Sequence, residues 1–206
     1  MKLLTRKPLL GFYSLAALGV FPLLAVLVKP AADAADSAPP PIPVELSAPM
    51  VERTPTFSLD AVSPDVLWLA RCIYSETKRP DEQELVAWVV RNRVDTRYRG
   101  QDSYREVVLD PFQFSAFNAD SGKRRFYSSL TPESRWRGWQ NALRIAHEVY
   151  WANQDDRPFH KRTRHFYSER SMKDFVKPYW VEGYAPIELP NHDIDPWRFR
   201  FYKGVR

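Results

Sequence analysis

Cysteine and histidine are scarce in this sequence, which has one Cys and four His among 206 residues. The single cysteine, Cys72, excludes an internal disulfide as a source of stability. The histidines show no recognised metal-binding spacing and form no HExxH motif. We therefore expect neither a catalytic metal nor a cofactor.

Charged residues are absent from residues 9–28, an apolar run that follows Lys2, Arg6 and Lys7. A basic start followed by an apolar run is typical of an export signal. This run is long enough to span a bilayer, so we favour an uncleaved membrane anchor within residues 1–30. The alternative is a signal peptide. The protein would then be secreted, instead of facing the periplasm or wall from the inner membrane.

The next segment, residues 31–57, is rich in proline, alanine and serine. Such a segment buries too little apolar surface to fold, so we expect a disordered linker. Residues 58–206 then form one domain, which is long enough to have a hydrophobic core.

The net charge of +5 and the pI of about 9.3 favour an anionic partner. Anionic wall components and nucleic acids both qualify. Because the N-terminal segment predicts export, we expect a wall polymer as partner and no nucleic acid. We also expect the domain to be monomeric.

Two amphipathic helices are predicted between residues 63 and 94. Ser63 is suited to cap the first helix, and Pro64 is suited to its first turn. Apolar residues then recur at the spacing of one helix face, at Val66, Leu69, Ala70 and Ile73.

A short polar corner separates the two helices. Pro80 disfavours a helical Arg79, so Glu76 falls in the last turn of the first helix. We expect the second helix to begin with a capping box formed by Asp81 and Glu84.

The position of Glu76 predicts a raised pKa. The end of a helix carries partial negative charge, and the neighbouring Ile73 and Tyr74 would add desolvation. A carboxyl that stays protonated near neutral pH can act as a general acid. Lys78 and Arg79 would cancel the shift if they contacted Glu76. On position alone, a solvated glutamate at a helix end is the more common case.

Two further helices are predicted. Ser103 and Glu106 suggest a capping box for a short helix that ends before Asp110. Residues 131–152 form a longer helix, which we expect Thr131 to cap. Its apolar face consists of aromatic and aliphatic residues at helical spacing, Trp136, Trp139, Leu143, Ala146 and Tyr150.

Helical periodicity fades after this helix. Residues 164–168 and 198–202 alternate polar with apolar side chains, which predicts two short strands in a small C-terminal sheet. The fold class expected from the whole pattern is α+β.

Three blocks of the sequence carry a family resemblance. The first comprises residues 70–76 (ARCIYSE) and 86–94 (VAWVVRNRV). The second includes residues 107–108 (VV), Pro111 and residues 113–115 (QFS). The third comprises residues 165–168 (HFYS), 178–180 (PYW) and 199–202 (FRFY). In this order, over residues 65–205, they resemble the SleB-type cell wall hydrolases, which include spore-cortex-lytic enzymes. The loop after Glu76 is shorter than in that family and lacks its usual glycine.

The resemblance implies a mainly helical, lysozyme-like lobe and a small β-rich lobe with a groove between them. It implies that Glu76 is catalytic and that Gln113 and Ser115 hydrogen-bond sugar hydroxyls or N-acetyl groups. It further implies that Phe114 or Phe117 packs on a sugar face. Without the resemblance, these loop residues would be assigned to a buried loop.

His165 and Tyr167 are groove residues by the same resemblance. Their alternative role is cross-strand packing in the predicted sheet. We weigh the two roles equally.

The substrate implied by the resemblance is the peptidoglycan glycan strand, cut between N-acetylmuramic acid and N-acetylglucosamine. Ordinary glycosidases pair two carboxylates. No second acid stands out here, because Asp81, Asp110 and Asp120 suit caps or loops. The family implies a lytic transglycosylase instead, in which Glu76 acts as acid and then base and the product is a 1,6-anhydro sugar. Water attack, as in a muramidase, is the alternative.

Two other classes of function stay open at this stage. One is a peptidoglycan-binding or scaffold module without activity, which the shortened loop favours. The other is a wall peptidase that uses Cys72 with His147 or His165. Cys72 lies within a helix beside its apolar face, where a small core residue is the more common case.

Overall fold

The computed structural model describes residues 56–205, apart from residues 173, 175, 193 and 196. The chain divides into two units, Met1–Pro49 and Met50–Arg206, and the described residues belong to the second. The expected anchor or signal in residues 1–30 and most of the expected linker in residues 31–57 lie outside the described part. Within that part, no helix is both long enough and apolar enough to cross a membrane.

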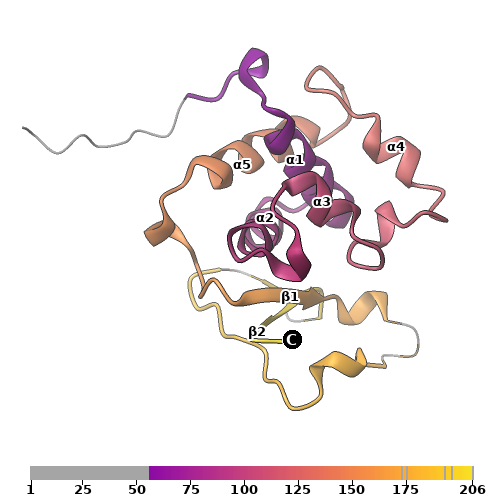
Figure 1. Ribbon diagram of the computed structural model, residues 1–206, viewed down its shortest axis with the longest axis vertical. Coiled ribbons are helices and arrows are strands. Elements are labelled where there is room, and N and C mark those ends of the chain that lie inside the picture. The colour runs from indigo at the N-terminus through magenta and orange to yellow at the C-terminus, as the bar shows by residue number, and fades with distance from the viewer. Residues whose placement is uncertain (1–55, 173, 175, 193, 196, 206) are drawn as a thin grey trace, which may run out of the picture. The chain divides into compact units, whose positions relative to one another are not determined.

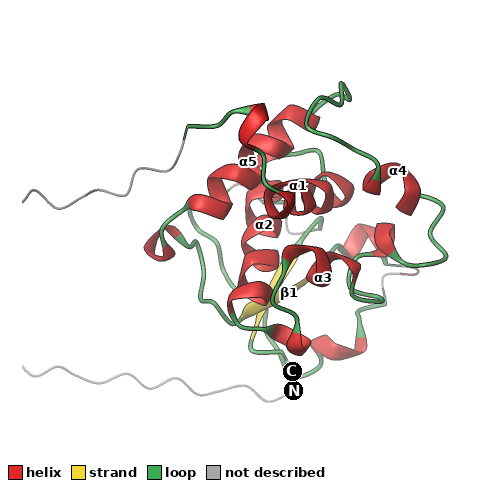
Figure 2. Cartoon of the chain, turned by 45° about the horizontal axis from the view of Figure 1, so that its top comes forward, coloured by secondary structure: helices red, strands yellow, loops and turns green. Residues whose placement is uncertain are grey.

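The described chain is mainly helical (Figure 2). Its α-helices are α1 (Pro64–Glu76), α2 (Pro80–Asp95), α3 (Tyr104–Leu109), α4 (Arg124–Ser128) and α5 (Trp139–Trp151). Short 3-10 helices lie at Leu59–Ala61, Tyr98–Gly100, Ser115–Phe117, Gln154–Asp156, Glu169–Ser171 and Tyr179–Val181.

Helix α1 is the centre of the helical part. It packs against α2, α3 and α5, and α2 also packs against α5 (Figure 1). The main core lies between these helices and is built from buried apolar side chains that include Leu69, Ile73, Val86, Trp88, Val108, Trp139 and Leu143.

Two of the expected helix caps are confirmed. The Ser63 hydroxyl accepts a hydrogen bond from the Val66 N–H at 3.2 Å, and Pro64 is the first residue of α1. The Ser103 hydroxyl accepts one from the Glu106 N–H at 3.2 Å at the start of α3, whereas the Glu106 carboxylate accepts from the Asp102 N–H at 3.3 Å, so the serine half of the expected capping box is confirmed. Both serines satisfy N–H groups that have no partner inside the helix.

The expected capping box of α2 is wrong. Pro80 is the first residue of the helix, and the preceding Arg79 is extended and makes no side-chain cap. Asp81 and Glu84 therefore already lie inside the helix. Proline suits a first helical position because its fixed φ is helical and its missing N–H would have no partner there.

The expected start of the last helix is also wrong. Helix α5 begins at Trp139, because Gly138 before it has a left-handed backbone with a φ of 77°. Trp136 consequently lies outside the helix and is 56% exposed. The helical spacing of Trp136 to the following apolar residues was coincidental.

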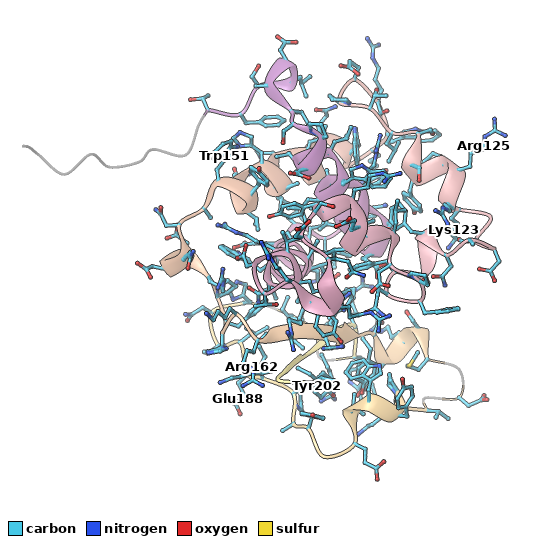
Figure 3. All side chains as sticks on the ribbon, viewed as in Figure 1. Lys123, Arg125, Trp151, Arg162, Glu188 and Tyr202 are labelled. Atoms are coloured by element: carbon cyan, nitrogen blue, oxygen red, sulfur yellow. The ribbon has the colours of Figure 1, made fainter. Side chains whose placement is uncertain are left out.

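The C-terminal part contains the two expected strands, β1 (Thr163–Tyr167) and β2 (Arg200–Lys203). They pair antiparallel, with Phe166 opposite Phe201. Tyr202 lies in this part of the molecule (Figure 3). The prediction of an α+β fold with a mainly helical part and a small C-terminal sheet is thereby confirmed at this coarse level.

Helix α2 connects the helical part to the sheet. Phe199 and Phe201 pack on Leu85 and Val89 of α2. At the other end of α2, the Asn92 side-chain amide donates a hydrogen bond to the Thr163 carbonyl at 2.9 Å. The Arg93 Nε donates one to the Arg164 carbonyl at 2.8 Å. Apolar and polar contacts thus fix β1 against α2.

Candidate active site

Glu76 is the last residue of α1, as predicted. The next residue, Thr77, is extended, and its N–H closes the helix on the Ile73 carbonyl. The Thr77 hydroxyl donates to the Glu82 carboxylate at 2.5 Å, and the Gln83 amide donates to the Thr77 carbonyl at 2.8 Å. Because Glu82 and Gln83 are fully buried on α2, the backbone beside Glu76 is held by the core of the protein.

Arg198 joins this corner to the C-terminal part. Its Nε lies 2.6 Å from Glu82 Oε1 and its Nη2 lies 3.0 Å from Glu82 Oε2. Such two-point contacts between guanidinium and carboxylate are short and directional. The Glu82 side chain is 0% exposed, and its ion pair with Arg198 compensates for that burial.

A cavity of about 340 Å³ opens between α1, the loop after α3, and the C-terminal part. Its walls come from these segments and consist of Glu76, Arg93, Phe112, Gln113, Ser115, Phe166, Tyr167, Ser168, Arg170, Ser171, Met172, Arg198 and Phe199. Glu76 is the single carboxylate among the described residues that line it, whereas three lining residues are arginines.

Three further residues predicted for the site lie in the wall of this cavity with Glu76. Gln113 is half-buried and Ser115 is exposed, so both side chains have access to its interior. Tyr167 is more buried, and its ring stacks on Tyr202 of β2 with centroids 5.8 Å apart. The structure therefore brings Glu76 together with Gln113, Ser115 and Tyr167.

Phe114 and Phe117 were expected to pack on sugar, but the structure places both in the core, each 2% exposed. The Phe114 ring lies under the Arg93 guanidinium at 5.1 Å. Phe117 packs edge-on against Trp68. Both rings fill space beneath the loop, so neither presents an open face on which a sugar ring could stack.

His165 is also absent from the cavity wall. It is buried, and its Nε2 lies 3.0 Å from the Tyr98 hydroxyl. Burial, together with the nearby charges of Arg93, Arg164 and Arg99, lowers the pKa of His165 to about 3. The imidazole is therefore neutral at physiological pH, and its observed contacts are those of a packing residue.

Burial raises the pKa of Glu76 from 4.5 to about 7, and this outweighs the opposing effects of Arg93, the Ser75 hydroxyl and Lys123. Lys123 lies near α4 (Figure 3). The predicted upward shift is confirmed. Roughly half of the Glu76 population is therefore protonated at neutral pH, as a general acid requires.

The two cations that would have cancelled this shift by contacting Glu76 make other contacts. The Lys78 ammonium contacts the Tyr74 carbonyl and lies over the Tyr74 ring. Arg79 pairs with Glu82 at 3.5 Å.

Arg93 is the unusual cation of the site. It is 4% exposed and lies in the wall of the cavity, and its Nη1 has no hydrogen-bond partner among residues 56–205 as described. Its burial lowers the pKa of the guanidinium to about 10, so it is still charged at neutral pH. A buried cation is costly unless negative groups compensate for its charge, and Asp110 and Glu76 both interact electrostatically with Arg93.

The residues of the site and its supporting corner that were not predicted from sequence include Glu82, Arg93, Phe112 and Arg198. Arg93 was visible only as part of the Asn-Arg-Val block. Glu82 and Arg198 are 116 positions apart, and no local pattern connects them. Phe112 directly precedes the Gln-Phe-Ser block, and this adjacency was the one signal available for it.

The described residues hold no cluster of three or more His, Cys, Asp or Glu side chains that could bind a metal ion. Cys72 is fully buried in the core. Burial raises the pKa of its thiol well above the ordinary value. The functional groups in the described cavity wall are therefore one carboxyl with a raised pKa, three arginines and polar loop side chains.

Comparison of the chain with protein-family models, with curated proteins and with solved structures finds no match. The likeness to SleB-type hydrolases thus depends on the sequence blocks described above.

Proposed function

We propose that this domain cleaves the glycan strand of peptidoglycan and that Glu76 is its general acid and base. The observation that carries the proposal is a half-buried carboxyl with a pKa of about 7 in the wall of an open cavity. A carboxyl in that state can protonate a glycosidic oxygen near neutral pH, a role that buried glutamates play in other glycosidases.

A lytic transglycosylase is the form of this reaction that we favour. The Glu76 proton moves to the glycosidic oxygen as the bond from C1 of N-acetylmuramic acid breaks. The Glu76 carboxylate then accepts the proton of that sugar's 6-hydroxyl as its O6 bonds to C1, which gives a 1,6-anhydro end. This sequence needs one carboxylate and returns it protonated. The absence of a second carboxylate among the described wall residues supports it.

Arg93 would assist the middle of this cycle. Once Glu76 has given up its proton, the half-buried carboxylate carries a negative charge. The buried Arg93 guanidinium favours that charge, since it acts to lower the Glu76 pKa. Arg93 is in this account a positioning and electrostatic residue, and Glu76 is the catalytic one.

The same proposal includes three further points. They are membership of the SleB-type family, a lysozyme-like helical lobe, and attachment to the inner membrane through residues 9–28. The sequence blocks around Glu76, Gln113 and Tyr167 support the family, since these three residues lie in one cavity wall. The substrate, a wall polymer outside the cytoplasm, agrees with the export signal expected in the first 30 residues.

A binding module without activity is the second candidate. The corner after Glu76 has only Thr77, Lys78 and Arg79 between the helices, and this short loop departs from the pattern of the SleB-type hydrolases. The peptidase alternative loses support. Cys72 has no access to solvent, and the raised pKa of its thiol opposes formation of the thiolate nucleophile.

The test is release of soluble fragments from purified peptidoglycan by the full chain and by Glu76→Gln. We expect the substitution to lower the rate by about 10²–10⁴-fold, the range that general acid–base groups contribute. Glu148→Gln is the matched control, since Glu148 is exposed on α5 and should leave the rate unchanged. Wild-type protein that sediments with peptidoglycan but releases nothing would establish the binding module instead.

A further inference from the structure

Phe112 occupies a backbone conformation that phenylalanine rarely adopts. The Gln113 N–H bonds to the Asp110 carbonyl at 3.2 Å, which closes a four-residue turn. Pro111 is the second residue of this turn, and Phe112 is the third, with a φ of 65°. A turn with Pro second and a positive φ third is of type II, in which the third residue is commonly glycine.

The Phe112 side chain does not compensate for this conformation by packing. It is 87% exposed, whereas Phe114 and Phe117 in the same loop are buried. The other non-glycine residues with positive φ in the described ranges are polar, namely Arg97, Arg99 and Asp174. The Phe112 N–H bonds to the Asn118 side chain at 3.0 Å, so the turn is held in place.

Phe112 is a wall residue of two hollows. One is the cavity that contains Glu76. The other is a second hollow of about 250 Å³ with a mainly apolar wall that includes Leu109, Pro111, Phe117 and Ala119. Phe112 lines both, so a chain-like ligand that occupied the two hollows together would pass this residue.

We propose that Phe112 is a sugar-stacking residue and that the adjacent apolar hollow takes the N-acetyl group of the stacked sugar. The inference rests on the proposed function and assigns the path of the glycan strand away from Glu76. It also transfers to Phe112 the stacking role that sequence reasoning had given to Phe114 or Phe117.

The chemistry of an N-acetylated hexose fits these surfaces. One face of the pyranose ring is apolar and gains by leaving water against an aromatic ring. The acetamide methyl group is apolar and small enough for the hollow. Strained backbone that presents an exposed side chain is typical of ligand-binding positions, where the strain is maintained for function.

The test measures binding of soluble β-1,4-linked N-acetylglucosamine oligomers by calorimetry, in the Glu76→Gln background so that no cleavage occurs. We expect Phe112→Ala to weaken binding about tenfold or more and Phe112→Tyr to restore most of it. Trp136→Ala is the control, because Trp136 is exposed elsewhere and should leave binding unchanged. β-1,4-Linked glucose oligomers, which lack N-acetyl groups, should bind more weakly than the N-acetylated ones.

Thermal unfolding of Phe112→Gly separates binding from folding. Glycine is relaxed at positive φ, so the melting temperature should stay within about 2 °C of the parent or rise, while glycan binding falls. Unchanged glycan affinity in Phe112→Ala, in a protein that binds and cleaves glycan, would overturn the inference and leave the proposed function intact. No glycan binding and no fragment release by any form would remove the proposed function, and this inference with it.

Discussion

The helical part and the C-terminal part of the described chain are held together by different kinds of contact. In the helical part, α1, α2, α3 and α5 bury a continuous set of apolar side chains. In the C-terminal part, two short strands carry small aromatic clusters, and much of the remaining chain is irregular. Arginine contacts link the two parts, through Arg93 to β1 and through Arg198 to Glu82. The candidate site lies where these contacts meet, so its geometry depends on the polar links between the two parts as well as on the apolar packing of Phe199 and Phe201 against α2.

Arg198→Ala is expected to give the largest loss of stability. It leaves the carboxylate of Glu82 buried with only the partly exposed Arg79 nearby. Loss of one partner of a buried pair costs about 3–5 kcal/mol, which chemical denaturation would measure.

The matched control replaces both partners, as Glu82→Gln with Arg198→Met. It should recover much of the stability, because no charge is then buried alone. If Arg198→Ala cost less than about 1 kcal/mol, the polar link between the two parts would be unimportant.

Glu76→Gln should increase stability at alkaline pH while it removes activity. The pKa of Glu76 rises from 4.5 in the unfolded chain to about 7 in the folded protein, so the folded protein binds this proton more tightly. Wild-type stability therefore falls as pH rises from 4.5 to 7, and the glutamine variant escapes that loss. We expect a gain of about 3 kcal/mol at pH 8.5 and little difference at pH 4.

Urea unfolding of both proteins at the two pH values would measure this gain. A glutamine variant that is less stable than wild type at pH 8.5 would show that the carboxylate is stabilised in place, contrary to the account.

Arg93→Gln should move the pH dependence of glycan cleavage upward. Activity requires protonated Glu76, so kcat/KM should fall as pH rises through about 7 in the wild type. Since Arg93 lowers the Glu76 pKa, loss of its charge should shift the alkaline limb of the kcat/KM–pH profile to higher pH by about one unit.

Arg93→Lys, which keeps a positive charge, is the control and should shift the limb less. An unmoved limb in a folded Arg93→Gln protein would assign Arg93 a purely structural role in holding β1.

Cys72→Ala tests the core away from the site and should have the smallest effect. The side chain is small and buried, so we expect about 1 kcal/mol of lost stability and an unchanged rate of wall cleavage. Loss of activity with a retained fold would revive the peptidase alternative.

The same contrast explains what the sequence could predict. Helix α1 and its cap at Ser63 followed from apolar spacing and cap chemistry, and the two strands followed from alternation. The direction of the Glu76 pKa shift was also predicted, but its cause in the structure is burial. The helix, its cap and the strands depend on neighbours in the sequence, which local patterns record.

The features that sequence reasoning missed depend on distant residues or on backbone conformation. No local pattern pairs Glu82 with Arg198, and no pattern told which phenylalanine of residues 112–117 would be exposed. The wrong prediction that the last helix begins at Thr131 has a similar cause, since the left-handed backbone of Gly138 interrupts an apparently continuous helical pattern. The site is therefore less predictable than the core on which it is built.

The masses of the soluble products test whether Glu76 cleaves glycan by acid and then base catalysis. Purified peptidoglycan would be incubated with the full chain and with Glu76→Gln, and the fragments analysed by mass spectrometry. The account predicts 1,6-anhydro-muramic acid ends from the wild type and none from the variant. Fragments with unchanged yield from Glu76→Gln, or intact glycan strands with both proteins, would contradict it.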